Sequence, residues 1–144
     1  METTVPDTAW TLHPRIAADT VPVGDLPLCR VLLANDANYP WLMLVPRRAG
    51  IFELMDFAPE DRATLSAEID AAARALKAIT DCDKINIAAF GNVVPDVHVH
   101  VIGRRHSDAA WPKPVWGAAT ATAYDPAVRD GFVTALRRAL GVTG

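Results

Sequence analysis

The sequence predicts an α+β domain, in which an antiparallel sheet packs against one long helix and a C-terminal helix. One segment has apolar residues at helical spacing over several turns, and short apolar runs of strand length lie before and after it. The elements follow in the order strand, strand, helix, strand, strand, helix. This order favours an antiparallel sheet over a doubly wound parallel one. No repeat, linker or change in composition divides the 144 residues, so we expect a single domain spanning 1–144.

Two helices are predicted from periodicity and capping signals. The longer one covers residues 59–79, with Pro59 at the first helical position and two acidic residues after it, where the helix dipole favours negative charge. Its apolar stripe consists of Leu65, Ile69, Ala72, Leu76 and Ile79. The second helix covers residues 126–140 and is capped by Asp125. Its inward face is predicted to consist of Val128, Phe132, Leu136 and Leu140.

Three of the predicted strands are short apolar runs. Residues 29–34 and 41–45 flank the turn-forming segment 35–40, which indicates an antiparallel pair. Residues 84–90 follow the long helix and form the third strand. The proline-containing stretch before Asp25 is predicted to be loop, with one short strand near residues 10–13.

Composition limits the classes of function. Half of the residues (51%) are hydrophobic and 22% are charged, which is typical of a globular protein. The net charge is −3 and basic residues cluster only in pairs, so nucleic-acid polymers are disfavoured as partners. Cys29 and Cys82 form no CxxC pair, and we expect both to be reduced, buried thiols. METTVPDTAW has no signal-peptide pattern and no apolar run is long enough to span a bilayer, so we expect a cytoplasmic protein without a membrane partner.

The fourth strand, residues 97–102, carries the most informative pattern. Its three valines share one face, whereas Asp96, His98 and His100 share the other. A neutral imidazole is a good nucleophile near pH 7, and a second histidine beside it can hydrogen-bond a phosphate oxygen or protonate a leaving group. The pattern alone leaves three readings open: catalysis on phosphorus, a metal site using all three side chains, or two partly exposed histidines on a polar face.

The segment GNVVPDVHVHVI, residues 91–102, resembles the active-site strand of the histidine triad (HIT) family, whose motif is His-φ-His-φ-His-φ-φ with φ apolar. In this alignment Asp96 stands at the first histidine, His98 at the second and His100 at the third. The sequence WPKPVWG at residues 111–117 resembles the ending of a bacterial HIT-like branch that tolerates a non-histidine at the first position. The resemblance covers roughly residues 12–117 and implies a sheet of about five strands.

The resemblance implies a role for each matching residue. His98 corresponds to the nucleophile on the α-phosphate, and His100 to the residue that contacts the phosphate. Asn92 matches a residue that binds the α-phosphate, Asn86 one that lines the phosphate site, and Asn35 or Asp36 one that holds the ribose. Asp96 faces the same site, where a carboxylate could accept an imidazole N–H from His98 and raise its pKa, or repel the phosphates of a substrate.

The implied activity is cleavage at the α-phosphate of a nucleotide conjugate, either a dinucleoside polyphosphate or a nucleoside phosphoramidate, through a nucleotidyl-histidine on His98. The implied partner is thus a small nucleotide, the chemistry itself requires no metal or other cofactor, and the family suggests a homodimer. Two alternatives stay open. One is a nucleotide-binding protein with little or no catalysis, and the other is a metal-dependent hydrolase using Asp96, His98 and His100.

Overall fold

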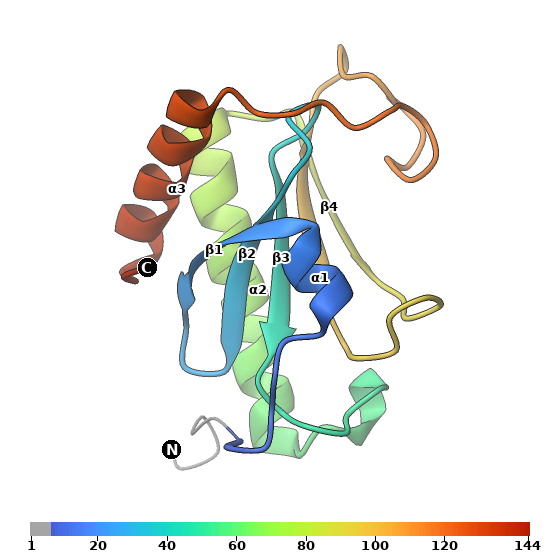
Figure 1. The fold of residues 1–144 in the computed structure, drawn as a ribbon, viewed down its shortest axis with the longest axis vertical. Coiled ribbons are helices and arrows are strands. Elements are labelled where there is room, and N and C mark those ends of the chain that lie inside the picture. The colour runs from blue at the N-terminus through green and yellow to red at the C-terminus, as the bar shows by residue number, and fades with distance from the viewer. Residues whose placement is uncertain (1–6) are drawn as a thin grey trace.

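The computed structural model describes residues 7–144 and shows an antiparallel sheet with helices on both faces (Figure 1). The expectation about a signal peptide concerns residues 1–6 in part, and these lie outside the described residues. The strands are β1 (Thr20–Asp25), β2 (Cys29–Ala34), β3 (Trp41–Pro46), β4 (Lys84–Ala89) and β5 (Val99–Arg104). They form one five-stranded sheet in the order β1-β2-β3-β5-β4 with every neighbour antiparallel. The predicted α+β class and the predicted sheet are therefore confirmed.

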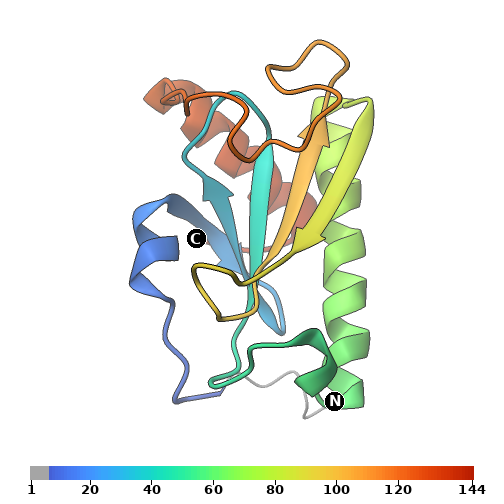
Figure 2. The ribbon, with the colours of Figure 1, turned by 90° about the vertical axis from the view of Figure 1, so that its right-hand side faces the viewer.

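The main core lies between the sheet and the helices α2 (Pro59–Thr80) and α3 (Pro126–Leu140). Figure 2 shows both helices on the same side of the sheet. The core valines of β5 and of the residues before it pack here with Leu65, Ala72 and Leu76 of α2, as the alternation predicted. Because these valines fill one face of β5, the histidines on the same strand must face the opposite side.

The opposite face of the sheet is covered by α1 (Pro14–Ala18) and by loops. Ile16 of α1 packs with Leu32 of β2 and with Val94, a residue of the loop that precedes β5. A second small cluster brings Val115 from the long C-terminal loop onto Ile102 of β5. The site described below opens between these two clusters.

The N-terminal prediction is wrong in its details. Residues 10–13 form no strand, and the chain instead builds α1 followed by the edge strand β1. Pro22 and Gly24 gave this segment the composition of a loop, but an edge strand accepts proline because one side of its backbone needs no partner. The pairing with β2 shifts its register between these two residues.

The ends of two predicted apolar faces also need correction. Val128 is 61% exposed on α3, where Val133 and Leu136 are the buried residues, and Ile79 is exposed near the end of α2. In each helix the predicted apolar face extends about one turn beyond the part of the helix that packs against the core. Cys29 and Cys82 are free and buried, as expected. Among residues 7–144, none of the helices has the length and apolar character that a membrane crossing requires.

Candidate active site

The side chain of His98 is oriented by the backbone two residues before it. His98 precedes β5 directly and is only 9% exposed. Its Nδ1 lies 2.7 Å from the carbonyl oxygen of Asp96. Because a carbonyl only accepts, Nδ1 must carry the hydrogen and donate it, so the lone pair of the neutral ring resides on Nε2. The sequence raised the Asp96 carboxylate as a possible acceptor for this imidazole; the structure assigns the contact to the Asp96 carbonyl instead.

His100 has the opposite tautomer. The Trp41 indole N–H, which can only donate, lies 2.9 Å from Nδ1 of His100. Nδ1 therefore accepts, and the hydrogen of the neutral ring sits on Nε2. His100 is 3% exposed, and burial, followed by the nearby His98, lowers its pKa to about 4. His100 is thus a neutral hydrogen-bond donor at pH 7.

The two imidazoles form a pair with complementary free nitrogens. Their ring centroids are 5.1 Å apart and the rings are inclined at 73°. Phe90 stacks on His100 at 5.6 Å, and Trp116 meets it edge-on at 4.9 Å. These aromatic side chains pack around the ring of His100. His98 therefore offers a lone pair on Nε2, and His100 offers an N–H group. This combination suits nucleophilic attack by His98 on an electrophile whose oxygen atom accepts a hydrogen bond from His100.

A cavity of about 600 Å³ opens in front of both histidines. We call it the first cavity; α1, the end of β2, the loop before β5 and the C-terminal loop all contribute to it. Three of the residues predicted to bind nucleotide line it together with the histidines, namely Asn35, Asp36 and Asn92. Asp36 is buried, and the backbone N–H groups of Asn38 and Thr122 donate to its Oδ1 at 3.0 and 3.2 Å. The carboxylate is therefore held in one position at the cavity edge.

The structure does not bring the other two predicted residues into this cavity. Asn86 lies on the same face of the sheet, but its Oδ1 accepts a hydrogen bond of 2.8 Å from Arg104. The Asp96 side chain lines neither cavity beside His98. Within residues 7–144, no three His, Cys, Asp or Glu side chains lie close enough together to hold a metal ion. The three-ligand arrangement considered from the sequence is therefore not formed.

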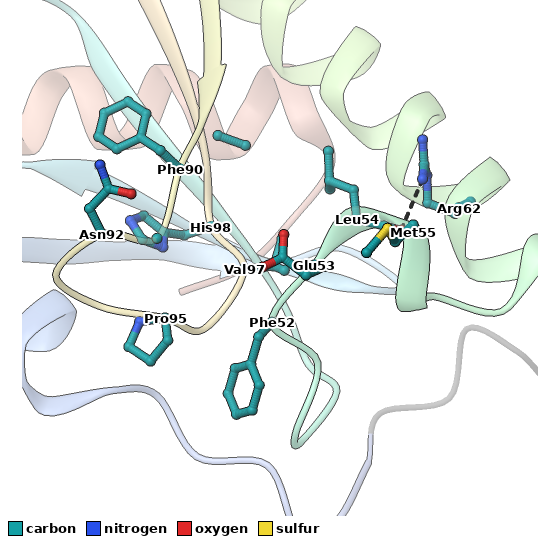
Figure 3. A pocket seen from close by; sticks show the side chains of 12 residues that line it. Phe52, Glu53, Leu54, Met55, Arg62, Phe90, Asn92, Pro95, Val97 and His98 are labelled. Atoms are coloured by element: carbon teal, nitrogen blue, oxygen red, sulfur yellow. Dashed lines mark hydrogen bonds between the residues drawn. The ribbon is translucent and has the colours of Figure 1, made fainter.

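A second cavity, of about 510 Å³, adjoins His98 and was not anticipated (Figure 3). It is formed by residues 52–55, which overlap the start of the 3-10 helix Leu54–Asp56, together with Arg62 of α2 and the loop before β5. In Figure 3, Phe90, Asn92 and His98 lie on one side and Met55 and Arg62 on the other. Residues 52–55 carry no recognisable motif, so no sequence signal could have found this cavity.

The contact between Trp41 and His100 was also missed. Nothing in the sequence links Trp41, the first residue of the second predicted strand, to His100. The register gives the reason for the contact, because β3 pairs with β5 so that Met43 lies opposite His100 and Trp41 opposite Ile102. Side chains two apart on a neighbouring strand share one face and lie within reach of each other when they are long.

The family model and the solved structures that match this chain point to the same family. The family model described as HIT domain matches residues 16–107. A crystal structure of a histidine triad protein from Bradyrhizobium japonicum is 54% identical, with a TM-score of 0.90 over 92% of this chain and 98% of that one. A histidine triad protein from Sinorhizobium meliloti is 43% identical, with a TM-score of 0.89 over 92% of this chain and 98% of that one. A histidine triad protein from Marinobacter aquaeolei is 39% identical, with a TM-score of 0.88 over 92% of this chain and 96% of that one. A search of curated proteins finds no match.

Proposed function

Because the chain belongs to the histidine triad family, which supports a nucleotide-binding or hydrolase type of function, we propose that it cleaves a nucleotide conjugate at the α-phosphate. His98 is the proposed nucleophile and His100 the proposed phosphate-binding partner. The observation that carries this proposal is the hydrogen bond between His98 Nδ1 and the Asp96 carbonyl, because it leaves Nε2 with its lone pair beside the cavity.

The proposed reaction has two steps on phosphorus. In the first, Nε2 of His98 bonds to the α-phosphorus, and the bond from phosphorus to the leaving group breaks. The leaving group takes the electron pair, and an amine leaving group also takes a proton from solvent. The ring becomes positively charged, and the Asp96 carbonyl dipole stabilises that charge through Nδ1–H. In the second step water attacks phosphorus, the electron pair of the N–P bond returns to Nε2, and the water proton goes to solvent.

The remaining residues of the first cavity have proposed binding roles. His100 donates from Nε2 to a phosphate oxygen, and its neutral state avoids placing a second cation beside the ring that becomes charged. Asn92 can donate to another oxygen of the α-phosphate, since its side chain lines the cavity with both histidines. Asn35 or Asp36, each of which lines the same cavity, is the proposed ribose ligand. Asn86 and Asp96 have no proposed role through their side chains.

Turnover assays with wild type and His98→Ala test the proposal. Adenosine 5′-phosphoramidate and diadenosine tetraphosphate cover the two substrate classes. Wild type is expected to release AMP from at least one of them, and the variant to lose at least about 10³-fold in kcat/KM. An acid-labile, base-stable adduct of nucleotidyl mass on wild type would identify the intermediate.

Two results would contradict the proposal. Turnover retained in His98→Ala would exclude this histidine as nucleophile. Binding of AMP without turnover of either conjugate would instead support a nucleotide-binding protein. The homodimer expected from the family stays a prediction, which sedimentation velocity checks.

A further inference from the structure

We propose that the second cavity binds the leaving group of the substrate, and that this leaving group is apolar rather than a second phosphorylated nucleoside. The inference rests on the proposed function, since it needs His98 to attack a phosphorus atom. It goes further because it assigns residues 52–55 and Arg62 to substrate selection and distinguishes between the two substrate classes.

The position of His98 between two cavities is the first argument. The two cavities share Phe90, Asn92 and His98 in their walls. The candidate ribose and phosphate ligands line only the first cavity or this shared wall. A substrate with its nucleoside in the first cavity and its α-phosphorus beside His98 therefore has the second cavity as the adjoining space for its remaining substituent.

The lining of the second cavity mixes polar and apolar residues, and its apolar side chains are the next argument. Phe52, Leu54 and Met55 are all exposed, and Met55 is 80% exposed. Phe90 on the opposite side is exposed as well. Exposed large apolar side chains gathered around one hollow mark a binding surface, because each of them gains by leaving water when a ligand covers it. The second cavity thus suits a ring or an alkyl chain.

The charges around this cavity argue against a polyphosphate. Its lining contains one cation, Arg62, and one carboxylate, Glu53. Arg62 already donates from Nη1 to the carbonyl oxygen of Leu54 at 2.9 Å. A dinucleoside polyphosphate would bring several negative charges here, and polyphosphate sites normally supply several cations or backbone N–H groups. With Glu53 present, the lining has no net positive charge to offer.

Three adenosine 5′-phosphoramidates test the proposal on the intact protein. One has an unsubstituted nitrogen, one an N-hexyl group, and one an N-(5-carboxypentyl) group of similar length with a terminal carboxylate. Wild type is expected to have the highest kcat/KM for the N-hexyl substrate and to lose at least about tenfold when the chain ends in a carboxylate. It should also prefer the N-hexyl substrate to diadenosine tetraphosphate.

A pair of matched variants locates the effect. In Met55→Glu, the ratio of kcat/KM for the N-hexyl substrate to that for the unsubstituted one should fall about tenfold. Val128→Glu adds the same charge at an exposed apolar position on α3 that lines neither cavity, and should leave the ratio unchanged. Glu53→Lys should raise kcat/KM for the carboxypentyl substrate relative to the N-hexyl one.

Several outcomes would overturn the inference. Wild type could turn over the hexyl and carboxypentyl substrates equally, or Met55→Glu could leave the ratio unchanged. Met55→Glu could also dissociate an oligomer in sedimentation while Val128→Glu does not, without any change in the ratio, which would identify the surface as an interface between copies. Failure of the proposed function would be seen separately, as absence of turnover of every substrate or as turnover that survives His98→Ala.

Discussion

The two ends of the open face of β5 carry buried polar side chains that are used in different ways. At one end, Arg104 is 1% exposed, and its guanidinium donates from Nε and Nη2 to Asp108 and from Nη1 to Asn86. At the other end, His98 and His100 each have one ring nitrogen bonded within the protein, and a cavity lies in front of both rings. Each guanidinium nitrogen of Arg104 has a hydrogen-bond partner within the protein, whereas the histidine pair keeps hydrogen-bonding capacity for a ligand.

Both ends have aromatic surroundings, but these have different electrostatic consequences. Arg104 lies 5.7 Å from the ring of Tyr39 and 5.5 Å from that of Trp111. A guanidinium stays charged in such a place and therefore needs a counterion, which Asp108 supplies. A histidine loses its charge instead, as the low pKa of His100 shows. Burial is thus common to both ends of the strand, and unused hydrogen-bonding capacity is what distinguishes the histidine pair.

The largest expected effect concerns the Arg104 end of β5. Asp108→Asn leaves the buried Arg104 charge without its counterion, so we expect the free energy of unfolding to fall by about 3 kcal/mol. Urea denaturation measures this loss. Asp130→Asn, which removes an exposed pair with Arg129, is the matched control and should change stability by less than about 0.5 kcal/mol. Equal losses in both variants would mean that the buried pair has no special importance.

The pKa of Asp108 also determines the pH below which the Arg104–Asp108 pair no longer stabilises the fold. Burial raises the pKa of Asp108, but hydrogen bonds from Arg104 and from the backbone N–H groups of Arg105, Ala110 and Trp111 outweigh it and hold the pKa well below its ordinary value. A carboxyl group whose pKa is lowered by folding stabilises the folded protein at pH values above the pKa that the group has in the unfolded chain. The contribution should be complete at neutral pH and disappear only as the pH falls below about 4 toward the folded pKa.

The second effect concerns the open end and has a pH dependence in a different range. The pKa of His100 is about 4 when folded and 6.5 at its ordinary value. Between these values the unfolded chain binds the proton more readily, so stability falls as the pH is lowered through this window. From pH 7 to pH 5 the loss should be about 2 kcal/mol. His100→Gln should abolish that part of the loss, whereas His106→Gln, which alters an exposed histidine, should retain it.

A third, smaller effect isolates the tautomer of His100. Trp41→Phe keeps an aromatic ring but removes the N–H that donates to Nδ1 of His100. We expect kcat/KM to fall about tenfold, since His100 would no longer be held with its hydrogen on Nε2. Trp10→Phe, on a tryptophan that contacts Arg30 at 5.1 Å, is the control and should leave kcat/KM unchanged. An unchanged rate in Trp41→Phe would show that the tautomer of His100 does not matter.

The smallest expected effect distinguishes whether Asn86 acts with the Arg104 cluster or with the histidine site. Asn86→Ala removes the hydrogen bond to Arg104 and should cost about 1 kcal/mol of stability, with kcat/KM within about twofold of wild type. Asn92→Ala should show the reverse, with a loss of kcat/KM and little loss of stability. A large kinetic defect in Asn86→Ala would instead support the phosphate-site role that the resemblance implied.

Strong local signals predicted most of the fold. The stripe in α2 and the alternation of β5 were clear signals, because each period persists over several residues and places the apolar residues of α2 and the valines of β5 on one side. The N-terminal α1 and β1 were not predictable in the same way. A helix of five residues is too short for a period, and Pro22 and Gly24 in β1 are residues that usually interrupt a strand.

The candidate site was predictable only in part. His98 and His100 stand out because two histidines at strand spacing share a face. Their hydrogen-bond partners could not be predicted, since one is a backbone carbonyl and the other a side chain from β3. The resemblance assigned Asn86 to the phosphate site, but sequence alone could not reveal that its amide oxygen accepts a hydrogen bond from Arg104.

The backbone acceptor for His98 has a consequence for the variability of the chain. Every amino acid supplies the same carbonyl oxygen, so the residue at position 96 can be exchanged without removing the acceptor that orients the ring. The aspartate at position 96 therefore orients the neighbouring imidazole through its backbone and not through its carboxylate. The orientation of the ring depends on the path of the backbone that leads into β5, and not on the side chain at position 96.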